Sequence, residues 1–409
     1  MHRPIRSLLL LPLAAILASC GDSFAPIESL PRELSVAEGK LVDADNRFAF
    51  KLFREVNARE EDGNNVFISP LSVGMALGMT YNGAAGTTRD AMQQTLELGG
   101  MTLPEVNDAY QTLIALLRDL DPRVDFLLAN SIWYRDGVAI VPEFLDLNKR
   151  YFDAEVTALD FSDPASVDVI NRWVNRKTNG KIADIVDPPI DPLTFMFLIN
   201  AIYFNGDWTY QFDKDRTTVE AFELADGSHV TVPMMSHGEE IPVRLYQDAE
   251  HTVLDLWYGG QAYSMTIVVP HDPGTINDVA RDLTDAQWNS WTLDLDSTNT
   301  QVSVPKFTLE YEIELNDVLK ALGMEVAFTG GADFTNMVAS GGAYIEKVMH
   351  KTFVDVNEEG TEAAAVTSVE MRLTSAPSSI RVDQPFIFAI RENYSGTILF
   401  MGKIVDPTG

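Results

Sequence analysis

The sequence predicts a mixed α+β (α/β) domain, because helix patterns gather early in the chain, strand patterns gather late, and one late segment alternates like a strand. That segment is residues 358–376, in which one side is small or apolar at Thr361, Ala363, Ala365, Thr367, Val369, Met371 and Leu373. The other side is mostly polar, which is typical of a strand with one face on a core. The adjacent alanines have a low strand propensity. The segment is therefore small enough to fit between strands, but its side chains alone would not keep it in a sheet. From this window alone, an ordinary half-buried strand is the simpler interpretation.

Helix signals come first along the chain. Apolar residues at helical spacing, or a proline in the first turn, predict helices at about 40–60, at 71–81, after Thr87, from Pro104, and at 164–178. In the first of these, Phe48, Leu52 and Val56 recur once per helical turn. The last ends at Asn179-Gly180, a pair that suits a helix C-terminus.

Strand signals follow. Alternation and β-branched or aromatic residues predict strands at 124–134, 194–205, 229–235, 252–258, 262–269, 301–309, 348–357, 386–390 and 397–405. The last two are joined by a turn at 393–396. No internal repeat or low-complexity block interrupts the order, which indicates mixed sheets beneath a helical layer.

Composition limits the possible partners. With 409 residues and 46% hydrophobic residues, the chain can build a large core, and length alone would suggest two or three domains. Its 30 basic and 60 acidic residues give a net charge of −30. Such a surface repels phosphate backbones and anionic headgroups, so nucleic acid and heparin-like partners are not expected.

The amino terminus looks like an export signal. Arg3 and Arg6 precede a short apolar run that ends in small residues and Cys20, the only cysteine of the chain. This pattern resembles a bacterial lipobox, so residues 1–19 are interpreted as a lipoprotein signal peptide and Cys20 as the lipidated residue. Residues 20–38 would then be a tether to the cell envelope, on its periplasmic or surface face, or the protein would be extracellular if released. A plain secretory signal is the alternative.

Catalytic and metal sites are poorly supported. The stretch 355–360 imitates the start of a calcium loop, but Val366 stands where the bidentate acid is needed. His237 has no second histidine at helical spacing, so no zinc-protease ligand set exists there. No nucleophile elbow or phosphate-binding loop is found. We therefore expect no cofactor, no metal site and no enzyme activity.

The surroundings of residues 358–376 suggest a moving part. A regular strand at 348–357 leads into Glu358, Glu359 and Gly360, and glycine at a strand end can act as a pivot. Downstream, 375–379 contains a proline and serines and is expected to be an exposed loop.

At this point the chain resembles the serpins, the serine-protease-inhibitor fold family, from about residue 39 to its end. The matching motifs are the hinge at 357–365 and the stretches 382–388, 65–72, 170–175, 198–208, 232–235 and 304–307. The resemblance implies one serpin domain at 39–409, with three β-sheets, eight or nine helices and an exposed reactive-centre loop at about 358–382.

The resemblance also implies a function. A protease cleaves the reactive loop, forms an acyl-enzyme, and is trapped when the loop inserts into the central sheet. The protein would then be an irreversible suicide inhibitor of serine, and possibly cysteine, endopeptidases, acting as a monomer. Small residues at Thr361, Ala363, Ala365 and Thr367 favour this over the alternative, a non-inhibitory serpin acting as a carrier, chaperone or binding protein.

Site residues follow from the matched motifs. The hinge comprises Glu358, Glu359, Gly360, Thr361, Glu362, Ala363, Ala364 and Ala365. The shutter, a polar cluster beneath the sheet, comprises Ser69, Ser72, Asn200 and His350. The breach, at the top of the sheet, comprises Trp208 and Lys306, and an ion pair between Lys306 and Glu358 is expected there.

The family places the cleaved bond at Thr374–Ser375, with cleavage after Leu373 or Arg372 as alternatives. Cleavage after Thr374 suits elastase-like enzymes, after Leu373 chymotrypsin-like or subtilisin-like ones, and after Arg372 trypsin-like ones. We expect elastase-like or subtilisin-like serine proteases to be the first targets.

Overall fold

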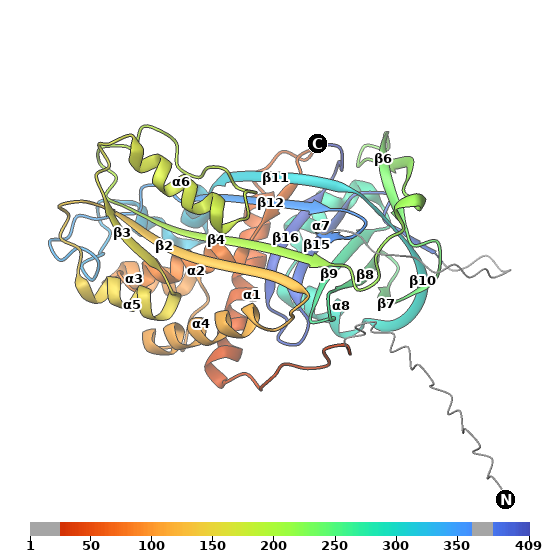
Figure 1. Cartoon of the computed structure of the whole chain (residues 1–409), viewed down its shortest axis with the longest axis horizontal. Helices are drawn as coiled ribbons and strands as arrows, with labels where there is room; N and C mark the ends of the chain where they lie inside the picture. Colours follow the sequence, from red (N-terminus) through yellow and green to blue (C-terminus); the bar gives the residue numbers. More distant parts are fainter. Residues whose placement is uncertain (1–24, 362–378) are drawn as a thin grey trace, which may run out of the picture.

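The computed structural model describes residues 25–361 and 379–409. Among them are nine α-helices, most of which gather on one side of the molecule (Figure 1). They are α1 (Val36–Asn57), α2 (Pro70–Tyr81), α3 (Gly86–Thr95), α4 (Leu103–Arg118), α5 (Pro142–Phe152), α6 (Ala165–Lys177), α7 (Ile276–Asp282), α8 (Asp285–Leu293) and α9 (Asn316–Leu319). In the described ranges, no helix is both long and apolar enough to cross a bilayer.

The smaller sheet has six strands in the order β11-β12-β13-β4-β2-β3. Their bounds are β2 (Val124–Arg135), β3 (Glu155–Leu159), β4 (Met196–Asp207), β11 (Phe307–Glu314), β12 (Met349–Val356) and β13 (Gly360–Thr361). The two-residue strand β13 is antiparallel to both of its neighbours, β12 and β4. Those two longer strands therefore run parallel to each other on either side of it.

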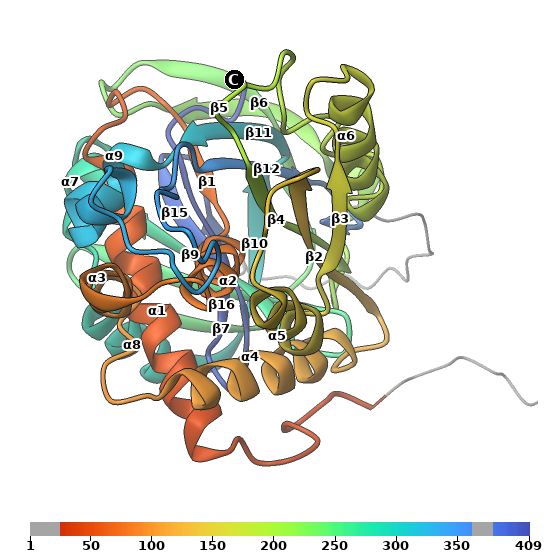
Figure 2. The same ribbon diagram turned by 90° about the vertical axis from the view of Figure 1, so that its left-hand side faces the viewer.

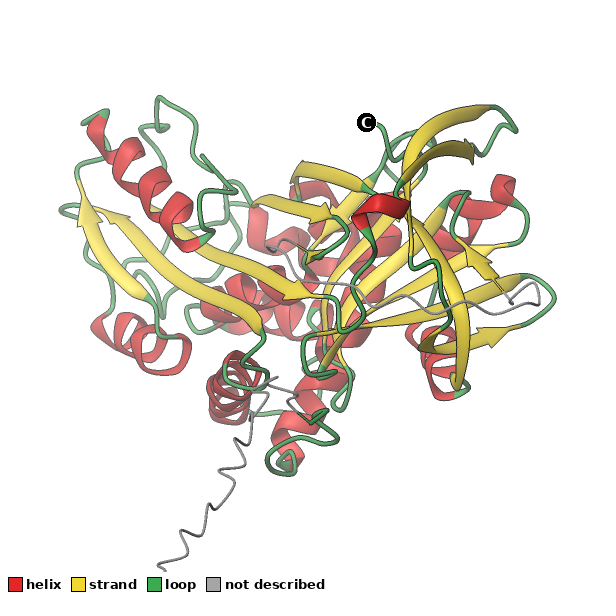
Figure 3. Ribbon diagram, turned by 45° about the vertical axis from the view of Figure 1, so that its right-hand side comes forward, coloured by secondary structure: helices red, strands yellow, loops and turns green. Residues whose placement is uncertain are grey.

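The larger sheet has ten strands, which gather at the right of Figure 3. They are β1 (Val66–Ile68), β5 (Thr218–Glu223), β6 (His229–Ser236), β7 (Ile241–Gln247), β8 (His251–Tyr258), β9 (Tyr263–Pro270), β10 (Asp296–Pro305), β14 (Ser379–Arg381), β15 (Phe386–Glu392) and β16 (Ile398–Ile404). Strand β10 pairs with β7 through residues 296–300 and with β6 through 303–305. The three expected sheets are thus one separate sheet and two that share β10.

The expected mixed α+β architecture is confirmed, and most predicted elements agree with the structure to within a few residues. One prediction was wrong, because 301–309 is two strands and not one. The chain changes sheets at Lys306, whose N–H donates to the carbonyl of Pro233 on β6 at 2.8 Å. The apolar positions change phase at this junction, from Val302 and Val304 to Phe307 and Leu309, a signal that the prediction of one continuous strand overlooked. Helix α5 was also missed, although Pro142 stands in its first turn.

Helices cover both faces of the six-stranded sheet (Figures 1 and 2). Helix α2, which is buried almost throughout, packs beneath β4, while α6 packs on β2 and β4 from the outer side. The sequence explains this, since α2 is apolar on all sides, whereas α6 presents Ile170, Trp173 and Val174 inward and charged residues outward. The parallel strands β4 and β12 are therefore supported from below by α2.

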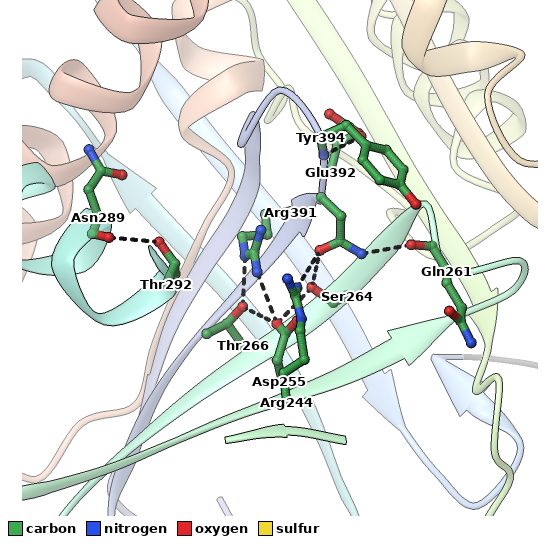
Figure 4. A network of polar contacts seen from close by, with 11 residues as sticks. Arg244, Asp255, Gln261, Ser264, Thr266, Asn289, Thr292, Arg391, Glu392 and Tyr394 are labelled. Carbon is green, nitrogen blue, oxygen red and sulfur yellow. Dashed lines mark hydrogen bonds and ion pairs between the residues drawn. The ribbon is translucent and has the colours of Figure 1, made fainter. Parts of the chain in front are cut away.

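A buried carboxylate ties four strands of the larger sheet together (Figure 4). Asp255 on β8 accepts hydrogen bonds from Ser264 and Thr266 on β9, at 2.8 and 2.5 Å. Its oxygens also form ion pairs with Arg244 of β7 and Arg391 of β15. Burial alone would raise the pKa of Asp255, but the two guanidinium groups hold it below its ordinary value. This network keeps β8, which ends beneath the site described below, in a fixed position.

The segment before α1 is attached to the domain. The N–H of Ile27 donates to the carbonyl of Gly260 at 2.7 Å, and the hydroxyl of Tyr394 donates to the carbonyl of Ile27. Leu30 and Leu34 also pack against the core. The segment from Ile27 onward is therefore packed on the domain, within the stretch expected as a tether.

Candidate functional site: the hinge and the gap beside it

The site is the gap between β4 and β12, at one end of which Gly360 and Thr361 pair with both strands. Strand β13 fills its upper end, where Thr361 pairs with Gly206 of β4 and with Val356 of β12. Beyond this point, the described residues contain no pairing between β4 and β12. A cavity of about 660 Å³ lies there, lined by β4, by β12 and by α2 below. The sheet thus has an opening one strand wide that continues from Thr361.

Gly360 is required where the chain turns into the gap. A Cβ at this position would lie 2.2 Å from the carbonyl oxygen of Gly206 and 2.7 Å from Cα of Asp207, so any side chain would meet backbone. Asn357 closes the turn, since its Oδ1 accepts from the N–H of Glu359 at 3.0 Å. The glycine predicted as a pivot therefore allows two backbones to approach closely.

Backbone hydrogen bonds hold the hinge from one side. The N–H of Trp208 donates to the carbonyl of Glu359, and the N–H of Phe212 donates to the carbonyl of Glu358, both at 2.8 Å. The indole Nε1 of Trp208 donates to the carbonyl of Asn357 at 2.9 Å. We call the segment 208–217, which supplies these donors, the hinge clasp.

Ion pairs add to the clasp. Lys306 Nζ lies 2.9 Å from Oε2 of Glu358, whose Oε1 accepts from the hydroxyl of Thr217 at 2.8 Å. Lys214 pairs with Glu359. Both glutamates are nearly buried, with 6% and 7% exposure. Burial by itself would raise the pKa of Glu358, but the bonds from Lys306 and Thr217 outweigh it and lower the pKa.

The first inserted side chain points into the body. The hydroxyls of Thr361 and Tyr258 are hydrogen-bonded at 2.7 Å, and Tyr258 is fully buried. The Tyr258 ring stacks on Trp208 at a centroid distance of 4.3 Å. Since Tyr258 ends β8, the position of Thr361 depends on the strand that Asp255 secures.

Ser69, Ser72 and His350 lie together beneath the sheet. The N–H of Ser69 donates to Nε2 of His350 at 2.9 Å, while Ser69 Oγ caps α2 by accepting from the N–H of Ser72. Ser69 Oγ also donates to the carbonyl of Leu399 on β16 at 2.8 Å. Burial lowers the pKa of His350 to about 4, so its ring is neutral and accepts at Nε2.

Asn200 lies across the cavity from His350. Its amide donates to Oδ1 of Asn130 at 2.7 Å, and its own Oδ1 is buried without a hydrogen-bond partner. The structure therefore joins Ser69, Ser72 and His350 directly, whereas Asn200 faces the same cavity from β4. An unpaired buried acceptor is rare enough to suggest that it is paired in another state.

Several predicted residues lie outside the described ranges. They are Glu362, Ala363, Ala364 and Ala365 of the hinge, the candidate bonds after Arg372, Leu373 and Thr374 with Ser375, and Cys20. The chain resumes at β14, which pairs in parallel with residues 301–303 of β10.

Sequence reasoning missed Tyr258, Phe212, Lys214 and Thr217. Tyr258 follows an apolar strand and looks like core, and the others lie in an irregular stretch with no periodic pattern. Only the backbone path brings them to the hinge, although the two adjacent acids at 358–359 signal that two basic partners are needed.

The comparisons with known proteins agree with this geometry. The family model for Serpin (serine protease inhibitor) matches residues 43–407. The chain belongs to the serpin family. Serpins are protease inhibitors and in general not enzymes.

The proteins similar to this serpin include an elastase inhibitor and a thyroxine-binding protein. It is 34% identical to human leukocyte elastase inhibitor over 381 residues, covering 90% of this chain and 100% of the relative. Among solved structures, the thermophilic serpin tengpin in its native state gives a TM-score of 0.82 at 30% identity, covering 93% and 96% of the two chains. Human thyroxine-binding globulin also gives 0.82, at 29% identity, covering 91% and 100%.

Proposed function

We propose that this serpin is a suicide inhibitor of serine endopeptidases, and that its cleaved loop enters the gap between β4 and β12. The observation that carries the proposal is the position of Gly360 and Thr361 as the first rung of a strand that the gap can extend. As the segment enters, its backbone N–H and C=O groups would form hydrogen bonds with β4 on one side and with β12 on the other.

The register of β13 predicts what each loop residue would meet. If the pairing of Thr361 with Gly206 and Val356 continues, Ala363 would lie between Phe204 and Val354. Alternate residues share a face, so Ala363, Ala365, Thr367, Val369 and Met371 would point inward like Thr361. These are the small and apolar side chains of the alternating segment. None of them is charged, so their insertion would bury no charge beneath the sheet.

The same register would bring Thr367 between Asn200 and His350. Oδ1 of Asn200 is buried and unpaired, and a threonine hydroxyl is a suitable donor for it. Insertion would thus satisfy a polar atom that the present state leaves unpaired. Because that gain adds to the new ladder, the inserted state is expected to be more stable than the intact one, which persists kinetically.

The preferred targets are elastase-like or subtilisin-like proteases. The support is the residue preceding the expected bond, Thr374, with Leu373 and Arg372 as alternatives, together with the similarity to leukocyte elastase inhibitor. We further propose that the protein is exported and carries a lipid on Cys20.

Mixing residues 21–409 with elastase, subtilisin, chymotrypsin and trypsin tests the inhibitor proposal. We expect an SDS-resistant covalent adduct with elastase or subtilisin and a released peptide that begins at Ser375. Cleavage without an adduct would favour the alternative, a non-inhibitory serpin with a binding role, for which the similarity to thyroxine-binding globulin is a precedent. A cut only after Arg372 would overturn the target preference.

Cleavage should also change stability. The cut protein should melt at a higher temperature than the intact protein, because its loop has become part of the sheet. Equal melting temperatures would contradict insertion, whatever the adduct experiment gives.

A further inference from the structure

His237 is a buried histidine that supports the hinge clasp from behind. It follows β6 and is 8% exposed. Its Nε2 is 2.9 Å from the carbonyl oxygen of Tyr210, and its ring lies 3.9 Å from that of Phe212, measured between centroids. Tyr210 and Phe212 both belong to the clasp, and Phe212 donates its N–H to Glu358.

The surroundings of the ring suit a neutral imidazole only. Nδ1 is buried without a partner, beside a cavity of about 10 Å³ lined by Ile241, Pro242, Leu256 and Trp257. A neutral ring leaves there an unpaired acceptor lone pair, which costs less than an unpaired buried charge. A protonated ring would place a donor and a positive charge in the same apolar setting.

Few charges face His237. On its own turn, Glu239 is near enough to favour the protonated form weakly. From the clasp, Arg216 lies against Gly238 and pairs with Asp213. Strand β10 offers the carbonyl of Val302, which accepts the backbone N–H of His237, and β7 and β8 contribute only the apolar side chains named above. No carboxylate among these contacts reaches Nδ1.

We infer that His237 is a positioning residue whose protonation loosens the hinge clasp, so that acid frees the hinge of this serpin. Burial lowers the pKa of His237, so in the folded protein the neutral form is favoured. The contribution of this neutral form to stability is complete above the ordinary histidine pKa of 6.5 and is lost as pH falls below it.

The ion pairs of the clasp do not titrate over the same range. The pKa of Glu358 is lowered and that of Lys214 is raised, so both groups stay charged well below neutral pH. A change in the clasp between neutral and mildly acidic pH therefore does not arise from these ion pairs. The variants below separate His237 from Asp207, which precedes the clasp and whose pKa is raised by burial. The consequence for inhibition rests on the proposed function, whereas the opening of the clasp does not.

Hydrogen exchange on the intact protein tests the inference without a protease. The readout is the protection of the peptides covering 208–217 and 357–361 at about pH 7.5 and about pH 5.5, corrected for intrinsic exchange. We expect protection to fall by up to about tenfold at the lower pH in the natural protein. In His237→Gln, whose amide can still donate to Tyr210, protection should change with pH far less than in the natural protein.

His229→Gln is the matched control, because His229 lies on β6 and is exposed. It should behave like the natural protein. His237→Phe provides a second uncharged variant if the glutamine variant does not fold. A pH response that persists in the uncharged variants, or that is missing in the natural protein, would overturn the inference. Absence of an adduct with every protease would instead overturn the proposed function and leave the exchange result to stand.

Discussion

The hydroxyls of Tyr258 and Thr361 are hydrogen-bonded at 2.7 Å, and this contact links the end of β8 to the first inserted residue of the hinge. Both residues are buried, so water does not compete for the bond. The state of the hinge is therefore coupled to the larger sheet as well as to the strands on either side of it.

Tyr258→Phe should weaken that coupling while keeping the ring stacked on Trp208. Removing one hydroxyl leaves Thr361 Oγ1 buried without this partner, which costs about 1 kcal/mol of unfolding free energy. Urea denaturation of the intact protein measures the loss. Tyr344→Phe, at a more exposed position, serves as the control, and equal losses in the two variants would contradict the coupling.

Gly360→Ala should displace the hinge from the gap. The new Cβ would overlap the backbone of Gly206, and relief requires β13 to separate from β4, at a cost of about 1–3 kcal/mol. Hydrogen exchange of residues 357–361 should lose its protection. Gly39→Ala, where a Cβ meets no atom within 4 Å, should leave these residues unchanged. Retained protection in Gly360→Ala would show that the close approach is absent in solution.

Acid should destabilise the fold through His350. Its pKa falls to about 4 in the folded protein from the ordinary 6.5, so unfolded chains bind a proton that folded ones do not between these values. Stability should be complete above pH 6.5 and decrease by roughly 3 kcal/mol by about pH 4. His350→Gln keeps an acceptor for the N–H of Ser69 and should remove this component.

Comparing unfolding free energies of the natural protein and His350→Gln across that range isolates the effect. His229→Gln, at an exposed site, should retain the full pH dependence. The prediction fails if the glutamine variant shows the same slope as the natural protein.

Thr361→Arg should convert an inhibitor into a substrate. Thr361 is buried against Tyr258, and a guanidinium has no partner there, so entry of the loop slows and hydrolysis of the acyl-enzyme wins. The ratio of adduct to cleaved protein on a denaturing gel measures this partition. Thr361→Ser, which keeps the hydroxyl, should preserve the adduct, and an unchanged yield in the arginine variant would refute this description of loop entry.

The sequence was sufficient to predict the fold but not the clasp, and the structure describes the expected hinge only as far as Thr361. Gly360 and the alternating residues after it form a pattern that is visible in the local sequence, and the order of the matched motifs predicts the architecture. Lys214 and Phe212 reach the hinge only through an irregular path, which has no period to detect. Lys306 was expected beside Glu358, and the ion pair is present at 2.9 Å.

Asn200 illustrates a second limit. Its expected neighbours Ser69 and His350 are joined, but Asn200 donates instead to Asn130 across β2 and β4. The residues of a sequence motif are the same in every conformational state of a protein. The hydrogen bonds seen in a structure, by contrast, belong to one state. The partner of Asn200 therefore depends on how far the gap is filled, which no local pattern records.

The attachment of Ile27 to Gly260 has a consequence for a protein held at a surface. If Cys20 carries a lipid, the lipidated residue can lie no farther from Ile27 than about 25 Å, the length of the fully extended chain between them. The β8–β9 turn would then lie close to the bilayer, and the orientation of the domain relative to the membrane would be restricted. Such an inhibitor would act only on proteases that come close to the membrane.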